Sequence, residues 1–349
     1  DDWKKWNDSV AVAEHTNGEV VYRNLSQEPW SYMFNGIEFE RNGALSSDYY
    51  TLEKQKYMAF SGNLVAQVGQ YHELKMGFDY RKYTIRRFSI NTRVIGLFDR
   101  DDSTKALIDT PLETVGIEKW QNYMANTYGY DYEGNELDDG FDGAKQPVFA
   151  ALYFQDKIEY KHLIINAGIR IDYFDMDDYK LKNPANPEVN SSQGVFADEA
   201  WEEKDATVRV SPRLGFSFPA SDRTVFYLQY GKFVQMTELN DIYYGSRQFA
   251  RQIIEGGYYF IGGLGFDLGP ISTTSYEIGF RQQLGNFASV DVSGFYKNIK
   301  GQPQIIKQMT EPGAQIEAYD RLVNGDFSTT KGFELQFNSR RVKRVQTSV

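Results

Sequence analysis

Paired stretches of alternating apolar and polar residues are the feature that most limits how this chain can fold. In the run from Leu163 to Tyr173 every second residue is apolar, while polar or small residues such as Arg170 and Asp172 occupy the positions between them. Successive side chains of a β-strand point to opposite faces, so the run predicts a strand with one apolar and one polar face. A short turn at 161–162 joins it to a similar run, which indicates a hairpin.

Short turns and long connections alternate along the chain. The predicted strands are 32–39, 56–68, 73–90, 147–160, 163–174, 206–218, 224–234, 274–284, 288–299 and 333–337, with one more after 338; the long connections are 91–146, 175–205 and 235–270. This arrangement predicts an all-β fold, an antiparallel transmembrane β-barrel of the outer-membrane type with short periplasmic turns and long extracellular loops. Because closed bacterial barrels have an even number of strands, about eleven strands predict an incomplete portion of a barrel.

Hydropathy and length fit one architecture. The mean hydropathy is -0.55 and no run of about 18 apolar residues occurs, which argues against a transmembrane helix, whereas a barrel strand needs only about 9 to 11 residues. The rhythm of strands does not change along the 349 residues. We therefore expect a single partial β-barrel domain over 1–349, with the plug domain and the closing strands absent.

Negative charge is concentrated in two of the long connections. Residues 99–145 contain 12 acidic and 4 basic side chains, and residues 175–205 contain 9 and 3, in a chain with a net charge of -10. Such a surface repels polyanions, so no nucleic-acid partner is expected. It favours cations, including divalent ions shared with lipopolysaccharide, and we expect contact with outer-membrane lipid. The alternative is an ordinary solvated loop surface.

Charged residues also recur on the polar face of the predicted strands. They are expected to face the lumen and to contact a polar plug, or, alternatively, to solvate a wet interior and pair with one another. The candidates are Arg170, Asp172, Arg209, Arg213, Glu277, Arg281 and Glu334.

One acidic segment resembles a calcium-binding loop. Asp131, Glu133 and Asn135 stand at positions 1, 3 and 5 of an EF-hand-like spacing and Asp142 at position 12, but Glu136 occupies the position that requires glycine. Calcium binding is therefore a weak hypothesis, with a solvated loop as the alternative.

Other chemistry is poorly supported. The chain has no cysteine and three scattered histidines, and "GFSFP" ends in Pro219 where a nucleophile motif needs glycine. We expect no enzyme activity and no cofactor. Aromatic loop residues could stack on a sugar or bind a peptide, or could form small loop cores; they are Trp120, Tyr128, Tyr130, Trp201, Tyr243, Tyr258 and Tyr259.

Five runs, in order, resemble the second half of the barrel of TonB-dependent outer-membrane receptors. They are "FAALYFQDKIEYKHLIINAGIRIDYFD", "VSPRLGFSFPASDRTVFYLQYGKFVQ", "TTSYEIGFRQQL", "VSGFYKNIKG" and "TTKGFELQF". The likeness is greatest to receptors of Bacteroidota, which are Gram-negative, that carry an N-terminal carboxypeptidase-regulatory-like domain. It covers about 147–341 and is weak before Tyr57.

This resemblance implies a plugged barrel of about 22 strands in the cell outer membrane. Such a receptor captures a scarce ligand with its extracellular loops and imports it with energy from the TonB complex, which it contacts through the N-terminal region that these residues lack. Two alternatives remain at this point. One is a barrel that acts as a surface scaffold or secretion partner without TonB coupling, and the other is a soluble secreted β-protein that binds glycans.

Overall fold

The computed structural model describes residues 31–34, 37–40, 49–91, 126–131, 134–190, 195–246, 248, 250, 253 and 265–340. Within these residues, nine strands form one antiparallel sheet, each hydrogen-bonded to its neighbour in the order β15-β14-β13-β12-β11-β6-β5-β4-β3. The strands are β3 (Tyr49–Val68), β4 (His72–Asn91), β5 (Val148–Tyr160), β6 (Leu163–Asp175), β11 (Thr207–Ser221), β12 (Thr224–Gln235), β13 (Ile271–Leu284), β14 (Ala288–Met309) and β15 (Ala318–Ser339).

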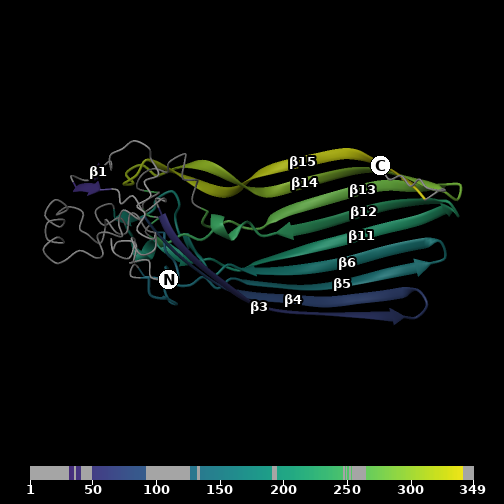
Figure 1. Ribbon diagram of the computed structural model, residues 1–349, viewed down its shortest axis with the longest axis horizontal. Helices are drawn as coiled ribbons and strands as arrows, with labels where there is room; N and C mark the ends of the chain where they lie inside the picture. Colours follow the sequence, from purple (N-terminus) through teal and green to yellow (C-terminus); the bar gives the residue numbers. More distant parts are fainter. Residues whose placement is uncertain are drawn as a thin grey trace, which may run out of the picture.

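Strands that are consecutive in the chain are neighbours in this sheet, if the short strands within the loops are left out. The tight turns gather at one end of the sheet, on the right in Figure 1, and the described parts of the long connections lie at the other end. Three of these turns contain a residue with a left-handed backbone, at Gly69 (φ 64°), Lys161 (φ 53°) and Gly285 (φ 58°). Positive φ is typical of tight hairpin turns. The expected all-β antiparallel fold is confirmed.

Two expected strands outside this sheet differ in outcome. The segment 32–39 does not form one strand, because β1 (Ser31–Phe34) and β2 (Ile37–Glu40) pair with each other as a separate two-stranded sheet. The strand expected after 338 lies outside the described residues, except for 339–340. The sheet therefore contains nine of the eleven expected strands.

The connection expected between Ile299 and Phe333 is mostly strand. β14 continues to Met309 and β15 begins at Ala318, and their pairing shifts register between Lys300 and Gln304. Gly301, with φ 79°, lies in this irregular stretch. Pro303 lies there too, where its missing N–H costs no ladder hydrogen bond. The irregular stretch therefore lies within a continuous pair of strands and does not end it.

The extracellular connections contain small cores of their own. Short strands pair there as β10 (Trp201–Glu203) with β7 (Tyr179–Leu181) and β8 (Val189–Asn190) with β9 (Val195–Phe196), and the 3₁₀ helices are η2 (Asp198–Ala200) and η3 (Leu239–Asp241). One core contains Tyr128, Met176, Ile242, Tyr243 and Leu268, and the other contains Leu181, Ala200, Ala250, Ile253, Phe266 and Tyr319. The main burial of apolar side chains is therefore in the loops, not between layers of sheet.

Candidate functional site: the polar face of the sheet

The pairing register separates the side chains of the sheet into two faces. Residues directly opposite in an antiparallel pair project to the same side, and the register aligns Arg209 with Asp172 and Val210 with Ile171. We call these sides the polar face and the apolar face. On the apolar face many large side chains are exposed, among them Phe78, Leu152, Ile171, Val208, Phe218, Phe226, Ile278, Phe333 and Leu335.

A soluble protein rarely exposes such a continuous apolar surface. Ile278 is 64% exposed, Leu335 71% and Phe333 91%. The same surface is what a barrel presents to the hydrocarbon of a bilayer, while its polar face lines a wet lumen. Among the described helices, none is long and apolar enough to cross a membrane; that finding does not bear on strands.

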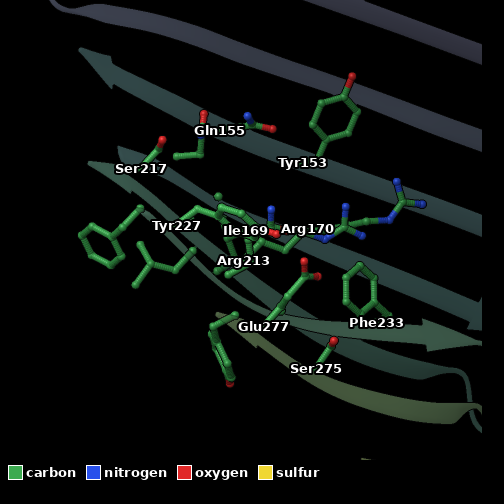
Figure 2. A pocket seen from close by; sticks show the side chains of 18 of the residues that line it. Tyr153, Gln155, Ile169, Arg170, Arg213, Ser217, Tyr227, Phe233, Ser275 and Glu277 are labelled. Atoms are coloured by element: carbon green, nitrogen blue, oxygen red, sulfur yellow. The ribbon is translucent and has the colours of Figure 1, made fainter. Parts of the chain in front are cut away.

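The polar face carries a hollow of about 950 Å³ lined by residues of five neighbouring strands. Figure 2 shows the side chains of Tyr153, Arg170, Arg213, Tyr227 and Glu277 gathered around it. These come from β5, β6, β11, β12 and β13, so residues far apart in sequence meet here.

The register places all seven sequence-predicted wall residues on the polar face. Arg209 is opposite Asp172 and Arg170 opposite Ser211; Arg213 is opposite Gly231, Glu277 opposite Gln229, Arg281 opposite Asp291, and Glu334 opposite Ser293.

Three of the seven are held by ion pairs within the wall. Arg170 Nε donates to Asp172 Oδ1 at 2.7 Å. Arg281 donates to Asp291 Oδ2 from Nε at 2.9 Å and from Nη2 at 2.6 Å. The Tyr227 hydroxyl, from a third strand, donates to the other oxygen, Asp291 Oδ1, at 3.0 Å.

The other four have no ion pair with any described residue. Arg213 instead lies over the Phe233 ring, 4.7 Å from its centroid, and Arg209 donates to the carbonyl oxygen of Val208. Glu277 and Glu334 are the other two residues without such an ion pair. Two arginines and two glutamates can therefore form ion pairs with groups outside the described residues.

Sequence reasoning missed Asp291 and Tyr227. Both lie on the polar parity of strands that the sequence predicts, alternating with Val290, Val292 and Phe226. The same parity argument that selected Arg281 could have selected them.

Two tyrosines of the polar face lie against glycines on neighbouring strands. Tyr153 is opposite Gly77 and Tyr227 opposite Gly279. A Cβ atom at Gly77 would be 2.6 Å from the Tyr153 ring, and one at Gly279 2.5 Å from that of Tyr227. Glycine at these positions leaves the space that each ring occupies against the adjacent backbone.

The candidate calcium loop is only partly described, since Glu133 lies outside the described residues. Asp131 accepts hydrogen bonds from the backbone and side-chain nitrogens of Asn135, each at 2.9 Å. Asp142 accepts one from the Ser246 backbone nitrogen at 2.6 Å and another from its hydroxyl. Calcium binding stays a prediction; equal calorimetric heats for the receptor and its Asp131→Ala variant would remove it.

Histidine offers no metal centre in the part of the chain that the structure describes. His72 Nδ1 lies 2.8 Å from Asp156 Oδ2, His162 lies in the β5–β6 turn, and His15 lies outside the described residues. Over those same residues, no group of three or more His, Asp or Glu side chains is arranged to hold a metal ion.

The loop aromatics that the structure describes belong mostly to the loop cores. Tyr128, Tyr130 and Tyr243 are buried, and Trp201 packs against one core. The Tyr243 hydroxyl donates to the carbonyl oxygen of Met176 at 2.6 Å, and burial raises the pKa of Tyr128 to about 12. Trp120, Tyr258 and Tyr259 lie outside the described residues.

A buried ion pair joins two of the long connections. Lys145 Nζ is 3.3 Å from Asp178 Oδ1, and the two side chains are 3% and 6% exposed. The ammonium group also donates to the carbonyl oxygen of Phe141 at 2.9 Å. Burial raises the pKa of the Asp178 carboxyl, and the nearby Lys145 charge opposes that rise.

The fold and its two faces define the class: part of the wall of an outer-membrane β-barrel. Residues 2–346 match the family model described as TonB dependent receptor-like, beta-barrel, so the chain belongs to that family of outer-membrane proteins. This location excludes the soluble glycan-binding alternative.

Solved structures similar to this chain include a transporter and two receptors. The FrpB iron transporter from Neisseria meningitidis (F3-3 variant) is 13% identical with a TM-score of 0.47, over 83% of this chain and 34% of that one. The Serratia marcescens hemophore receptor HasR, a double mutant with HasA and heme, is 13% identical (TM-score 0.47; 84% and 40%). The alcaligin receptor FauA from Bordetella pertussis is 11% identical (TM-score 0.41; 84% and 37%).

The chain spans from 34% to 40% of the length of these three proteins. No curated protein matches the chain in sequence.

Proposed function

We propose that these residues are a barrel portion of a TonB-dependent transporter that imports a scarce ligand captured by its extracellular loops. The observation that carries the proposal is the family match over 2–346, together with a sheet that has one exposed apolar face and one hollowed polar face. The receptor would be energised by the TonB complex through an N-terminal region, and the reaction would involve no covalent chemistry. The five motifs that resemble receptors of Bacteroidota support an origin in that Gram-negative group and an N-terminal carboxypeptidase-regulatory-like domain.

TonB coupling separates this proposal from a surface scaffold or secretion partner. The full-length receptor, solubilised from outer membranes, should bind the periplasmic domain of TonB from the same organism on an affinity column. A receptor from which the N-terminal region has been deleted is the matched control, and it should not bind. If the intact receptor also fails to bind, the result contradicts TonB coupling and favours the surface scaffold or secretion partner.

We also propose that residues 1–349 form one barrel domain and that part of its polar face contacts the plug. Arg209, Arg213, Glu277 and Glu334 are the best candidates, because none of them has an ion pair with a described residue, whereas Arg170 and Arg281 already have carboxylate partners. The plug should then carry charges of both signs.

Site-specific photo-cross-linking tests this contact. A benzophenone side chain in place of Arg213 or Glu277 should cross-link within the receptor to a segment outside these 349 residues. The same side chain at Ile278, which is the next residue and lies on the apolar face, should not. Equal yields at Glu277 and Ile278 would contradict plug contact.

A further inference from the structure

The Lys145–Asp178 pair brings an amine and a carboxyl together in an apolar enclosure. Lys145 Nζ lies 3.3 Å from Asp178 Oδ1, and the two side chains are 3% and 6% exposed. Nζ also lies 5.0 Å from the centroid of the Phe141 ring and 5.4 Å from that of the Tyr179 ring. These two rings are stacked, with their centroids 4.9 Å apart. The amine and the carboxyl are therefore in contact at a place that is largely closed to bulk water.

Hydrogen bonds hold the main chain on both sides of the pair. Lys145 and Ile85 of β4 exchange two backbone hydrogen bonds, at 2.8 Å and 3.0 Å. The backbone nitrogen of the next residue, Gln146, donates to Oδ2 of Asp177 at 2.7 Å, which ties the two segments together beside the pair. Two groups held in a reactive geometry behave as if at an effective concentration on the order of 10⁵ to 10⁸ M.

A second buried lysine lies beside the carboxyl. The Lys204 side chain is 7% exposed, and its backbone nitrogen donates to the carbonyl oxygen of Asp178 at 2.9 Å. The charge of Lys204 is close enough to lower the pKa of the Asp178 carboxyl, which also accepts a hydrogen bond from the Tyr179 backbone N–H. A buried cation and an N–H group in these places can stabilise negative charge that develops on a carboxyl oxygen.

The uncharged forms of the amine and the carboxyl are the reactive ones. An amine attacks through an unprotonated nitrogen, and a carboxyl can lose water once one of its oxygens carries a proton. Transfer of one proton from Lys145 Nζ to Asp178 Oδ1 across their 3.3 Å contact produces both forms at once. Burial penalises charged groups and raises the pKa of Asp178, which favours this transfer. The ion pair is thus the state that precedes the reaction.

We propose that Lys145 and Asp178 form an intramolecular amide bond once the receptor has folded. The lone pair of Nζ forms a bond to Asp178 Cγ, and the Lys204 ammonium group and the Tyr179 N–H stabilise the negative oxygen of the tetrahedral intermediate. The hydroxyl on Cγ then takes a proton from the nitrogen and leaves as water. One C–N bond replaces one C–O bond, so the step requires no oxidant, reductant or other reactant.

The amide bond would do for this chain what a disulfide does elsewhere. It links two extracellular connections through residues 33 positions apart, in a chain that has no cysteine. A covalent link of this kind restricts the unfolded chain and stabilises the folded loops. The bond belongs to the maturation of the receptor, so the proposal depends neither on TonB coupling nor on the transported ligand.

Mass spectrometry of tryptic digests tests the bond, with full-length receptor purified from outer membranes and denatured before digestion. Trypsin does not cleave after an acylated lysine, so the bond joins peptide 120–157 to peptide 171–180. This branched product is lighter by one water molecule than the two peptides together, and it should be the main form of 171–180 in the wild type. Lys145→Arg keeps the positive charge but has no primary amine, and it should yield no branched product.

Two further variants test the part played by Lys204. Lys204→Gln leaves both bonded residues in place and should lower the branched fraction at least about tenfold in newly synthesised receptor. Lys182→Gln is the matched control, because it removes an exposed lysine of the same connection, and it should leave the fraction unchanged. Heat-modifiable migration on gels verifies that each variant is folded.

The wild type alone can overturn the proposal. Unlinked peptides 120–145 and 171–180, without the branched product, would show that the pair stays ionic. Equal branched fractions in the wild type and Lys204→Gln would remove Lys204 from the reaction.

Discussion

The ring of Tyr227 lies against Gly279, its direct partner on the neighbouring strand, and its hydroxyl donates to Asp291 Oδ1, two strands away, at 3.0 Å. Because Gly279 of β13 has no side chain, the Tyr227 side chain of β12 can cross β13 and donate a hydrogen bond to Asp291 of β14. The arrangement positions Asp291 to accept Arg281 as well. Gly279 thus supports the hydrogen bonds of Asp291, although it has no polar side chain of its own.

Gly279→Val is expected to destabilise the folded barrel by about 1 to 3 kcal/mol, the usual cost of overpacking. Its Cβ would be 2.5 Å from the Tyr227 ring and 2.7 Å from the Val292 carbonyl oxygen. Urea unfolding in lipid vesicles measures the change. Gly215→Ala on the same face is the control, because its Cβ would meet nothing closer than 3.7 Å; equal losses in both variants would contradict the explanation.

The two faces predict opposite responses to the same new charge at adjacent positions. Ile278→Arg puts a cation on the apolar face and should cost about 2 to 4 kcal/mol near the bilayer midplane, with little folded receptor in the outer membrane. Glu277→Arg puts it on the polar face and should leave folding almost unchanged. Heat-modifiable migration of membrane fractions on gels measures both, and similar folded fractions would refute the assignment of faces.

The Lys145–Asp178 pair predicts a strong effect from removing one partner. Lys145→Met leaves the buried Asp178 carboxylate without its cation. The free energy of unfolding of the extracellular loops should fall by about 3 kcal/mol. Lys145→Met combined with Asp178→Leu should cost much less. Proteolysis of intact cells by an external protease, at increasing urea, measures the difference.

Acidification gives an internal check on that variant. Because burial raises the pKa of Asp178, the folded state takes up a proton more readily than the unfolded chain, so stability falls as pH rises through the folded pKa. Lowering the pH should therefore reduce the deficit of Lys145→Met. A deficit independent of pH would show that the carboxylate is not its cause.

Tyr128 predicts a loss of loop stability in alkali. Its pKa is raised by burial to about 12, against about 10 when unfolded. Below pH 10 both states keep the proton; between pH 10 and 12 the unfolded state ionises first, so stability falls by about 1 kcal/mol between pH 9 and 11. In the same proteolysis assay, Tyr128→Phe should reduce the loss of loop stability between pH 9 and 11. An unchanged loss would show that other groups cause it.

The alternation of apolar and polar residues was sufficient to predict most strands of the sheet and the face to which each side chain points. Val208 and Arg209 are adjacent, and a period of two sends them to opposite sides whatever the rest of the chain does. The same period placed Arg170, Glu277 and Glu334 together on one face before any pairing was known. The strand expected over 288–299 continues to Met309, because the irregular pairing between Lys300 and Gln304 that lets it continue depends on the partner strand.

Sequence by itself therefore determined that this protein is a wall with an apolar and a polar side, since strand alternation is a property of neighbouring residues. Only the tertiary structure decided which charges on that wall and in its loops have partners. Asp291 receives Arg281 and Tyr227 from two other strands, and Lys145 meets Asp178 across two loops. Those contacts join residues 10 to 64 positions apart, and they follow from register and loop packing, which no local pattern contains.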